Sequence, residues 1–304
     1  MQATLKSTIE FLGHGLHSNA PVKMVLKPAA ANVGIWFNRV DLDHGMISAR
    51  YDSVVPSQLC TLIRNDDGAE VSTIEHIMAA LAGCGVHNAM IDIDGPEVPI
   101  FDGSSKVFVE KILETGIQKQ AKPVRILEIL KPVEFRNGDA FARIEPSEEM
   151  VIDFEIDFTE AAIGNQSMAL TMANGTFLRE LSDCRTFCRQ SDVDMMQANG
   201  LALGGTLDNA LVFDDDKLLS PSGQRRDEEP VRHKMLDALG DLYLAGGPLM
   251  GRYTGFKAGH AMTNQLLRLV FADPSNFRFV ECDDQKADRL PGAHIKREDI
   301  AAFA

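Results

Sequence analysis

The two halves of this 304-residue chain repeat one order of sequence patterns, and the repetition limits the folds open to it. In the first half a strand pattern ends at Pro28 and an alternating strand pattern begins at Ile35; in the second half the matching positions are Pro146 and Ile152. Each half continues with a helix pattern that carries a histidine, then a strand, then a second helix. We interpret the repeat as a tandem duplication, with a chance likeness as the alternative.

Strands come before helices in each half, and this order favours an α+β fold over a doubly wound α/β fold. A polar segment ending in proline, residues 118–123, follows a helix pattern that stops at Gly116 and marks a boundary. It predicts domains 1–122 and 123–304, with an insert at about 184–219 in the second. The expected helices and strands of the repeat are 76–83, 89–93 and a helix from Ser104, then 233–240, 249–256 and a helix from His260.

Charge and cysteine content exclude several classes of protein. The chain has 30 basic and 44 acidic residues, a net charge of −14, which argues against a nucleic-acid binder. There is no signal-peptide pattern at the N-terminus and no apolar run of the roughly 18 residues that a spanning helix needs. Five cysteines without a Cys-x-x-Cys pair indicate reduced thiols. We therefore expect a cytoplasmic protein without stable membrane insertion.

One helix pattern places a histidine and a carboxylate one turn apart. Glu229 and Pro230 mark its start, and His233 and Asp237 follow at i and i+4, with Asp241 one turn further on. Zinc accepts imidazole nitrogen and carboxylate oxygen, so His233 and Asp237 could bind one ion. The alternative is an exposed helix face with a weak His–Asp ion pair.

The run Ser72-Thr-Ile-Glu75-His76 has two competing interpretations. Ser72 and Glu75 fit a capping box, in which Glu75 would bond its own helix terminus. The functional interpretation makes His76 a metal ligand and Glu75 the general base that takes a proton from attacking water. One carboxylate cannot easily do both in the same position.

His260 opens the last amphipathic helix. The positive end of the helix dipole would lower the pKa of its imidazole, and a nearby carboxylate such as Asp241 would raise it. Such a histidine can act as an acid or stabilise an oxyanion. The alternative is a surface cap.

These residues occur together and in order with further short motifs, and the ordered set resembles the UDP-3-O-acyl-N-acetylglucosamine deacetylases, which act in lipid A synthesis in Gram-negative bacteria. The resemblance runs from Gly13 to about Ala272. Its motifs are residues 13–17, 72–76, 102–104, 185–187, 204–210, 233–241 and 257–260.

The resemblance implies roles for individual residues. His76, His233 and Asp237 correspond to zinc ligands, and Glu75 corresponds to the general base. His260 corresponds to the general acid with Asp241 as its partner, and Thr186 to a hydroxyl that stabilises the oxyanion. The substrate contacts implied are Lys234 and Lys257 for phosphates or sugar and Phe158 for uridine. The family fold is two similar two-layer β/α sandwiches, whose helical layers pack together with the active site at their junction.

The insert corresponds to the family's passage for the 3-O-acyl chain. We expect Phe187, Leu201 and Leu203 to line it, and Gly205 of the glycine-rich run to contact substrate. Arg189 departs from the family pattern, which commonly has glycine and an aromatic residue after Phe187. Acyl-length preference is therefore not predicted. Cys60 matches a cysteine found near the site in many members and receives no catalytic role.

The expected activity is zinc-dependent hydrolysis of the N-acetyl group of a UDP-linked, 3-O-acylated glucosamine by a monomer. Ferrous iron also suits a ligand set of two histidines and one carboxylate. Two other classes stay open. A peptidase of the His-Glu-x-x-His type is disfavoured because that motif is missing. A non-catalytic nucleotide-sugar or acyl-chain binding protein of the same fold would bind substrate without releasing acetate.

Overall fold

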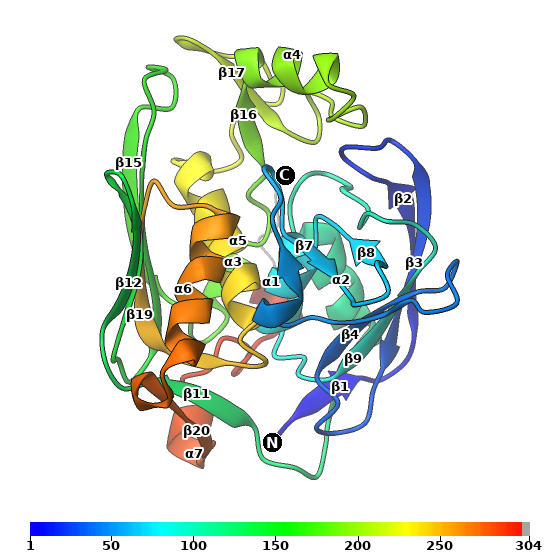
Figure 1. The fold of residues 1–304 in the computed structure, drawn as a ribbon, viewed down its shortest axis with the longest axis vertical. Coiled ribbons are helices and arrows are strands. Elements are labelled where there is room, and N and C mark those ends of the chain that lie inside the picture. The colour runs from blue at the N-terminus through cyan, green and yellow to red at the C-terminus, as the bar shows by residue number, and fades with distance from the viewer. Residues whose placement is uncertain (300–304) are drawn as a thin grey trace.

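The computed structural model describes residues 1–299 and has the mixed α+β architecture that the sequence predicts. Two β-sheets form the outer layers, and helices lie between them (Figure 1). The sheet formed by the first half lies on the right in this view and the sheet formed by the second half on the left. A continuous core of buried hydrophobic side chains includes residues from both halves.

The first sheet has five strands in the order β2-β3-β9-β4-β5. Neighbouring strands are antiparallel except β4 and β9, which run parallel. Alternate side chains of β4 and β9 are buried, so one face of the sheet packs on helices. The strands are β2 (Ile9–His14), β3 (Pro21–Pro28), β4 (Ile35–Arg39), β5 (Met46–Ser48) and β9 (Ala89–Ile93).

The second sheet contains the same arrangement. Its strands β12-β13-β19-β14-β15 follow one another as β2-β3-β9-β4-β5 do, and β14 and β19 are the parallel pair. Strands β11 and β20 extend this sheet beside β19. The strands are β11 (Arg125–Ile129), β12 (Val133–Asn137), β13 (Ala140–Glu145), β14 (Met150–Asp157), β15 (Asn165–Thr171), β19 (Leu249–Phe256) and β20 (Phe277–Glu281).

The helices repeat in the same way. Helix α1 (Glu75–Gly83) precedes β9 and α2 (Lys106–Thr115) follows it, just as α5 (Glu229–Tyr243) precedes β19 and α6 (His260–Ala272) follows it. The two halves thus share strand order, strand direction and helix placement, which agrees with the predicted duplication. That the halves 1–122 and 123–304 are separate domains stays our proposal, supported by the completion of each five-strand pattern within its own half.

Helices α1 and α5 pack closely against each other at the centre of the molecule (Figure 1). The contact depends on Gly240 of α5, because a Cβ atom there would lie 2.1 Å from the carbonyl oxygen of Glu75 in α1. A larger side chain would push the helices apart. This close crossing brings the first turn of α1, from the first half, beside the part of α5 that carries Asp237 and Asp241.

The insert forms a small subdomain at the upper end of the molecule in Figure 1. It consists of β16 (Phe187–Arg189), β17 (Leu211–Asp214), β18 (Lys217–Leu218) and helix α4 (Gln190–Ala198), which has no buried residue. The remaining short elements are β1 (Ala3–Leu5), β6 (Val54–Val55), β7 (Leu62–Arg64), β8 (Glu70–Val71), β10 (Ile117–Lys119), α3 (Thr176–Glu180), α7 (Asp284–Ala287) and the 3₁₀ turns Tyr51–Ser53, Pro274–Asn276 and Arg297–Asp299. Across residues 1–299, every helix is too short or too polar to span a bilayer.

Candidate active site

Three buried side chains from α1 and α5 bring their ligand atoms together. One ligand atom from each of His76, His233 and Asp237 lies within 4.8 Å of the others. Nε2 of His233 is 3.3 Å, and Nε2 of His76 is 3.6 Å, from Oδ1 of Asp237. His233 and Asp237 are 2% and 4% exposed, so the interpretation of their helix face as a solvated surface is wrong.

The protonation of this cluster suits a metal cation. Nδ1 of His233 lies 3.0 Å from the carbonyl oxygen of Cys184, so Nδ1 carries the proton and Nε2 keeps its lone pair toward Asp237. Burial lowers the pKa of His233 to about 3, which keeps the imidazole neutral. Burial would raise the pKa of Asp237, but His233 and Lys234 outweigh it and hold the pKa well below its usual range.

Asp237 has one free oxygen inside the cluster. Its Oδ2 accepts a 2.5 Å hydrogen bond from Nζ of Lys234, whereas the buried Oδ1 has no hydrogen-bond partner within residues 1–299. A buried carboxylate oxygen without a donor is costly unless a cation satisfies it. Two imidazole nitrogens and this oxygen therefore fit a metal ion, as the sequence predicted.

Glu75 is the first residue of α1, and its carboxylate faces the cluster. Its Oε2 accepts a hydrogen bond of 3.0 Å from the backbone N–H of Thr61, and its Oε1 lies 3.8 Å from Nε2 of His260. The capping box, one of the two interpretations of this run, does not form, because the Ser72 hydroxyl donates to the carbonyl of Pro96 instead. Burial raises the pKa of Glu75 above its usual value, as a general base requires.

His260 is paired with Asp241 across α6 and α5. Its Nδ1 lies 2.8 Å from Oδ2 of Asp241, and only 16% of the His260 side chain is exposed, so it is not a surface cap. Burial would lower the pKa of His260, but Asp241 and Glu75 outweigh burial and raise the pKa to about 9. His260 is therefore protonated at neutral pH, and its Nε2 faces Glu75 and the metal cluster.

Thr186 is held beside the cluster by the first half of the chain. Its backbone N–H donates to the carbonyl of Gly103, and its carbonyl accepts from the N–H of Leu211. Gly103 has a φ of +82°, and a Cβ there would lie 1.8 Å from the carbonyl oxygen of Asn209. Only glycine fits this contact, and Thr186 consequently lines the same cavity as the metal cluster.

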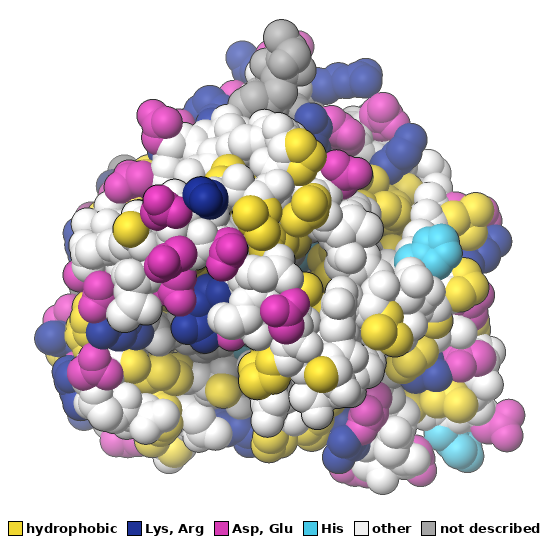
Figure 2. All heavy atoms as spheres, turned by 90° about the horizontal axis from the view of Figure 1, so that it is seen from above, with side chains coloured by type: hydrophobic (Ala, Val, Ile, Leu, Met, Phe, Trp, Pro, Cys, Tyr) yellow, Lys and Arg dark blue, Asp and Glu magenta, His cyan; other side chains and the backbone are white. Residues whose placement is uncertain are grey.

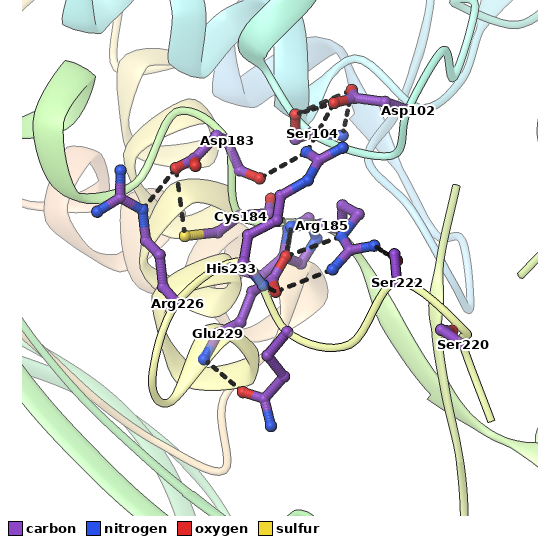
Figure 3. A network of polar contacts seen from close by, with 12 residues as sticks. Asp102, Ser104, Asp183, Cys184, Arg185, Ser220, Ser222, Arg226, Glu229 and His233 are labelled. Atoms are coloured by element: carbon purple, nitrogen blue, oxygen red, sulfur yellow. Dashed lines mark hydrogen bonds and ion pairs between the residues drawn. The ribbon is translucent and has the colours of Figure 1, made fainter. Parts of the chain in front are cut away.

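One buried and one partly buried ion pair fix the segment that carries Thr186 (Figure 3). The Arg185 guanidinium donates to both carboxylate oxygens of Glu229 at 3.0 and 3.2 Å, and both side chains are almost completely buried. Arg225 bonds Asp102 of the first half at 2.7 Å and the carbonyl of Asp183 at 2.8 Å. These contacts position Cys184, whose carbonyl orients His233, from both halves at once.

The metal cluster, Glu75 and His260 line a cavity of about 450 Å³. Lys234, Lys257, Phe158 and Phe187 also line it. The rings of Phe158 and Phe187 pack edge to face with centroids 5.5 Å apart. Lys257 does not project freely, because its ammonium group bonds Asp139 and Asp157 at 3.0 Å each.

A second cavity of about 280 Å³ lies between the insert and the loop at Leu16 and His17. Phe187 and Gly205 line it, as do four apolar residues of the insert that the sequence did not single out, Val193, Met196, Leu207 and Val212. Leu201 and Leu203 line neither cavity, because Leu201 follows the end of α4 and Leu203 is half exposed. Figure 2 views this end of the molecule and shows hydrophobic side chains beside hollows in the surface.

Arg189 lies outside both cavities. Its guanidinium donates to both carboxylate oxygens of Asp192 at 2.7 and 2.8 Å and lies 3.4 Å from Glu160. The side chain at the passage is that of Cys188, which lines both cavities. The departure at Arg189 therefore does not place a charge in the passage.

Sequence reasoning missed Thr61, which donates to the carboxylates of Glu75 and Asp241, and the Arg185–Glu229 pair. Thr61 follows Cys60, and both precede a strand far from Asp241 in sequence. Arg185 belongs to the motif at 185–187, and Glu229 marks the start of a predicted helix. No spacing rule links two residues that lie 44 positions apart. Cys60 lines the cavity, and burial together with Glu75 raises its pKa to about 11, so its thiol stays protonated.

Comparison with known proteins identifies the family of the chain. The family model described as UDP-3-O-acyl N-acetylglycosamine deacetylase matches residues 2–272. A relative from Idiomarina loihiensis is 43% identical over 94% of each chain, and one from Anaeromyxobacter sp. is 45% identical over 92% of this chain and 91% of its own. One from Vibrio parahaemolyticus is 42% identical over 93% of this chain and 94% of its own. All three are named UDP-3-O-acyl-N-acetylglucosamine deacetylase. The chain therefore belongs to the UDP-3-O-acyl N-acetylglycosamine deacetylase family.

Proposed function

We propose that this chain hydrolyses the N-acetyl amide of a UDP-linked, 3-O-acylated N-acetylglucosamine, giving acetate and a free amine, with zinc as its metal. The observation that carries the proposal is the convergence of His76, His233 and Asp237 with the carboxylate of Glu75 and the ring of His260. A metal-dependent amide hydrolase uses three parts in one place: a Lewis acid, a base and an acid. The relatives compared above are named as deacetylases, so the non-catalytic alternative has no support among them.

The proposed metal would be held by His76, His233 and Asp237. Three protein ligands with a remaining open position are typical of catalytic zinc sites. When bound, zinc would polarise the acetamide carbonyl and lower the pKa of water toward about 7. Ferrous iron accepts the same donors, so the identity of the ion is a matter for metal reconstitution.

The remaining steps belong to side chains of the protein. Oε1 of Glu75 takes a proton from the water that attacks the acetyl carbonyl. The hydroxyl of Thr186 and the protonated ring of His260 stabilise the oxyanion of the tetrahedral intermediate. Nε2 of His260 then donates its proton to the departing amine, while Asp241 holds Nδ1. The carbon–nitrogen bond breaks as that proton arrives, and acetate and the amine leave.

We propose that substrate binds across the two cavities. The aromatic pair Phe158 and Phe187 offers an apolar wall for uridine or the start of the acyl chain. Lys257 would reach a phosphate by exchanging one of its two carboxylate partners. The acyl chain would occupy the cavity lined by Val193, Met196 and Gly205.

We also propose that the chain works as a cytoplasmic monomer and does not bind nucleic acid. Its net charge of −14 disfavours phosphate backbones. The five cysteines are free thiols in the structure, as in a reducing compartment. Size-exclusion chromatography with light scattering tests the monomer, because a dimer would double the measured mass.

The deciding experiment measures acetate release from UDP-3-O-(3-hydroxyacyl)-N-acetylglucosamine by chelator-stripped protein. One equivalent of zinc should restore release, and an anaerobic arm with ferrous iron compares the two metals. His233→Ala should stay inactive with either ion. A folded, zinc-loaded protein that releases no acetate from a series of acyl lengths would overturn the proposal.

A further inference from the structure

Thr61 donates two hydrogen bonds, and each ends on a carboxylate of the proposed acid–base machinery. It precedes strand β7, and only 3% of it is exposed. Its backbone N–H donates to Oε2 of Glu75 at 3.0 Å. Its hydroxyl donates to Oδ1 of Asp241 at 2.5 Å. Glu75 starts α1 and Asp241 lies in α5, so one residue joins the base to the partner of the acid across both halves.

Because of these bonds, one oxygen of each carboxylate accepts from Thr61 and the other faces His260. With Oε2 of Glu75 occupied by Thr61, Oε1 is the oxygen that faces His260 Nε2, 3.8 Å away. With Oδ1 of Asp241 occupied, Oδ2 is the oxygen that holds His260 Nδ1 at 2.8 Å. Rotation of either carboxylate would break a bond to Thr61. Each working oxygen is therefore fixed in direction.

We propose that Thr61 is a positioning residue that sets the mutual geometry of Glu75, Asp241 and His260. The inference rests on the proposed function of these three residues. Thr61 is not among the residues that line the catalytic cavity, so it acts through its neighbours and not on substrate. Small errors in the placement of reacting groups are costly, because about 1 Å can reduce the rate about a hundredfold.

Substitutions at position 61 can separate the hydrogen bond to Glu75 from the hydrogen bond to Asp241. The bond to Glu75 comes from the backbone and survives any substitution other than proline, whereas the bond to Asp241 comes from the hydroxyl. Thr61→Val has nearly the same shape and removes only the hydroxyl donor. Thr61→Ser keeps the donor and removes a methyl group. The two variants therefore isolate the bond that orients Asp241, and through it His260.

The test compares the kinetics of these variants in zinc-loaded protein. We expect Thr61→Val to lower kcat about tenfold to a hundredfold with little change in KM, since a hydrogen bond to a charged group is lost. Thr61→Ser should recover most of kcat. Thr4→Val is the matched control, because Thr4 is also a buried threonine whose hydroxyl donates to a carbonyl, that of Asn88, away from the site. It should leave kcat unchanged.

A readout without turnover separates this inference from the proposed function. The ring proton shared by His260 Nδ1 and Asp241 should give a downfield proton resonance. The signal should shift or vanish in Thr61→Val and persist in Thr61→Ser and Thr4→Val, with zinc content equal in all. A Thr61→Val protein with wild-type kcat and an unshifted signal would overturn the inference. Wild-type protein without activity would refute the proposed function while the resonance still tested Thr61.

Discussion

Nδ1 of His260 lies 2.8 Å from Oδ2 of Asp241, and this pair joins the first residue of α6 to the last turn of α5. The carboxylate keeps a proton on a buried imidazole that would otherwise lose it. The ring can then donate from Nε2 on the side of the metal cluster. The pairing makes His260 an acid at neutral pH in a place where burial alone would make it a base.

The alkaline limb of the pH–rate profile should follow this pair. Activity requires protonated His260, so it should be full below its pKa of about 9 and fall as the pH rises through that value. Asp241→Asn removes the charge that raises this pKa, so the alkaline limb should move to lower pH. Profiles of kcat/KM for both proteins measure the shift. An alkaline limb unchanged in Asp241→Asn would contradict the assignment.

The acid limb should belong to Glu75. Activity requires the ionised carboxylate, and burial raises the pKa, so activity should rise with pH above the usual range for glutamate. Glu75→Gln keeps an oxygen for the Thr61 N–H but cannot take a proton, and kcat should fall about 10²- to 10⁴-fold. Zinc content measured on the same sample is the control. Loss of zinc together with kcat would point to a structural effect.

Metal binding should stabilise the fold through residues of both halves. An ion that binds only the folded chain adds about 2.7 kcal/mol when its free concentration is a hundred times Kd. Thermal unfolding with buffered zinc should show this gain in the wild type and lose it in His76→Ala and in Asp237→Ala. His260→Ala should keep the gain while losing activity, because His260 is not among the three clustered ligands. Equal stabilisation of His76→Ala would exclude His76 as a ligand.

The Arg185–Glu229 pair should be a large single contribution to stability. Glu229→Gln leaves a buried guanidinium without its counter-charge, and breaking such a pair costs about 3–5 kcal/mol of unfolding free energy. Urea titration measures the loss. Asp153→Asn is the matched control, because its pair with Arg252 is exposed and should contribute at most about 1 kcal/mol. A similar small loss in both variants would show that the buried pair is dispensable.

The sequence predicted those parts of the molecule that local patterns encode. The strand and helix order of both halves follows from hydrophobic periodicity, and His233 and Asp237 share a face because α-helical geometry requires it. Whether that face was buried could not be decided locally. It is buried because α1 crosses α5 at Gly240, a contact between residues far apart in the chain.

Local sequence patterns could not predict the residues whose contacts are with distant parts of the chain. No sequence pattern around Thr61 predicts its hydrogen bonds to Glu75 and Asp241, which lie 14 and 180 positions away. Leu201 and Leu203 were expected at the passage because they are apolar and lie in the insert. Helix α4 itself instead places Val193 and Met196 there, one turn apart. The apolar residues of the insert suggest a passage, but the fold of the insert determines which of their side chains line it.

The two halves repeat one strand order, but the proposed active-site residues are divided between them. The first half supplies Glu75 and His76, and the second supplies His233, Asp237 and His260. In the proposed mechanism, neither half alone carries all the metal ligands, the base and the acid. A chain cut near residue 122 would consist of two inert fragments, however well each one folded. Turnover would return only when the two fragments reassembled with α1 packed against α5. Acetate release would therefore measure the association of the two halves.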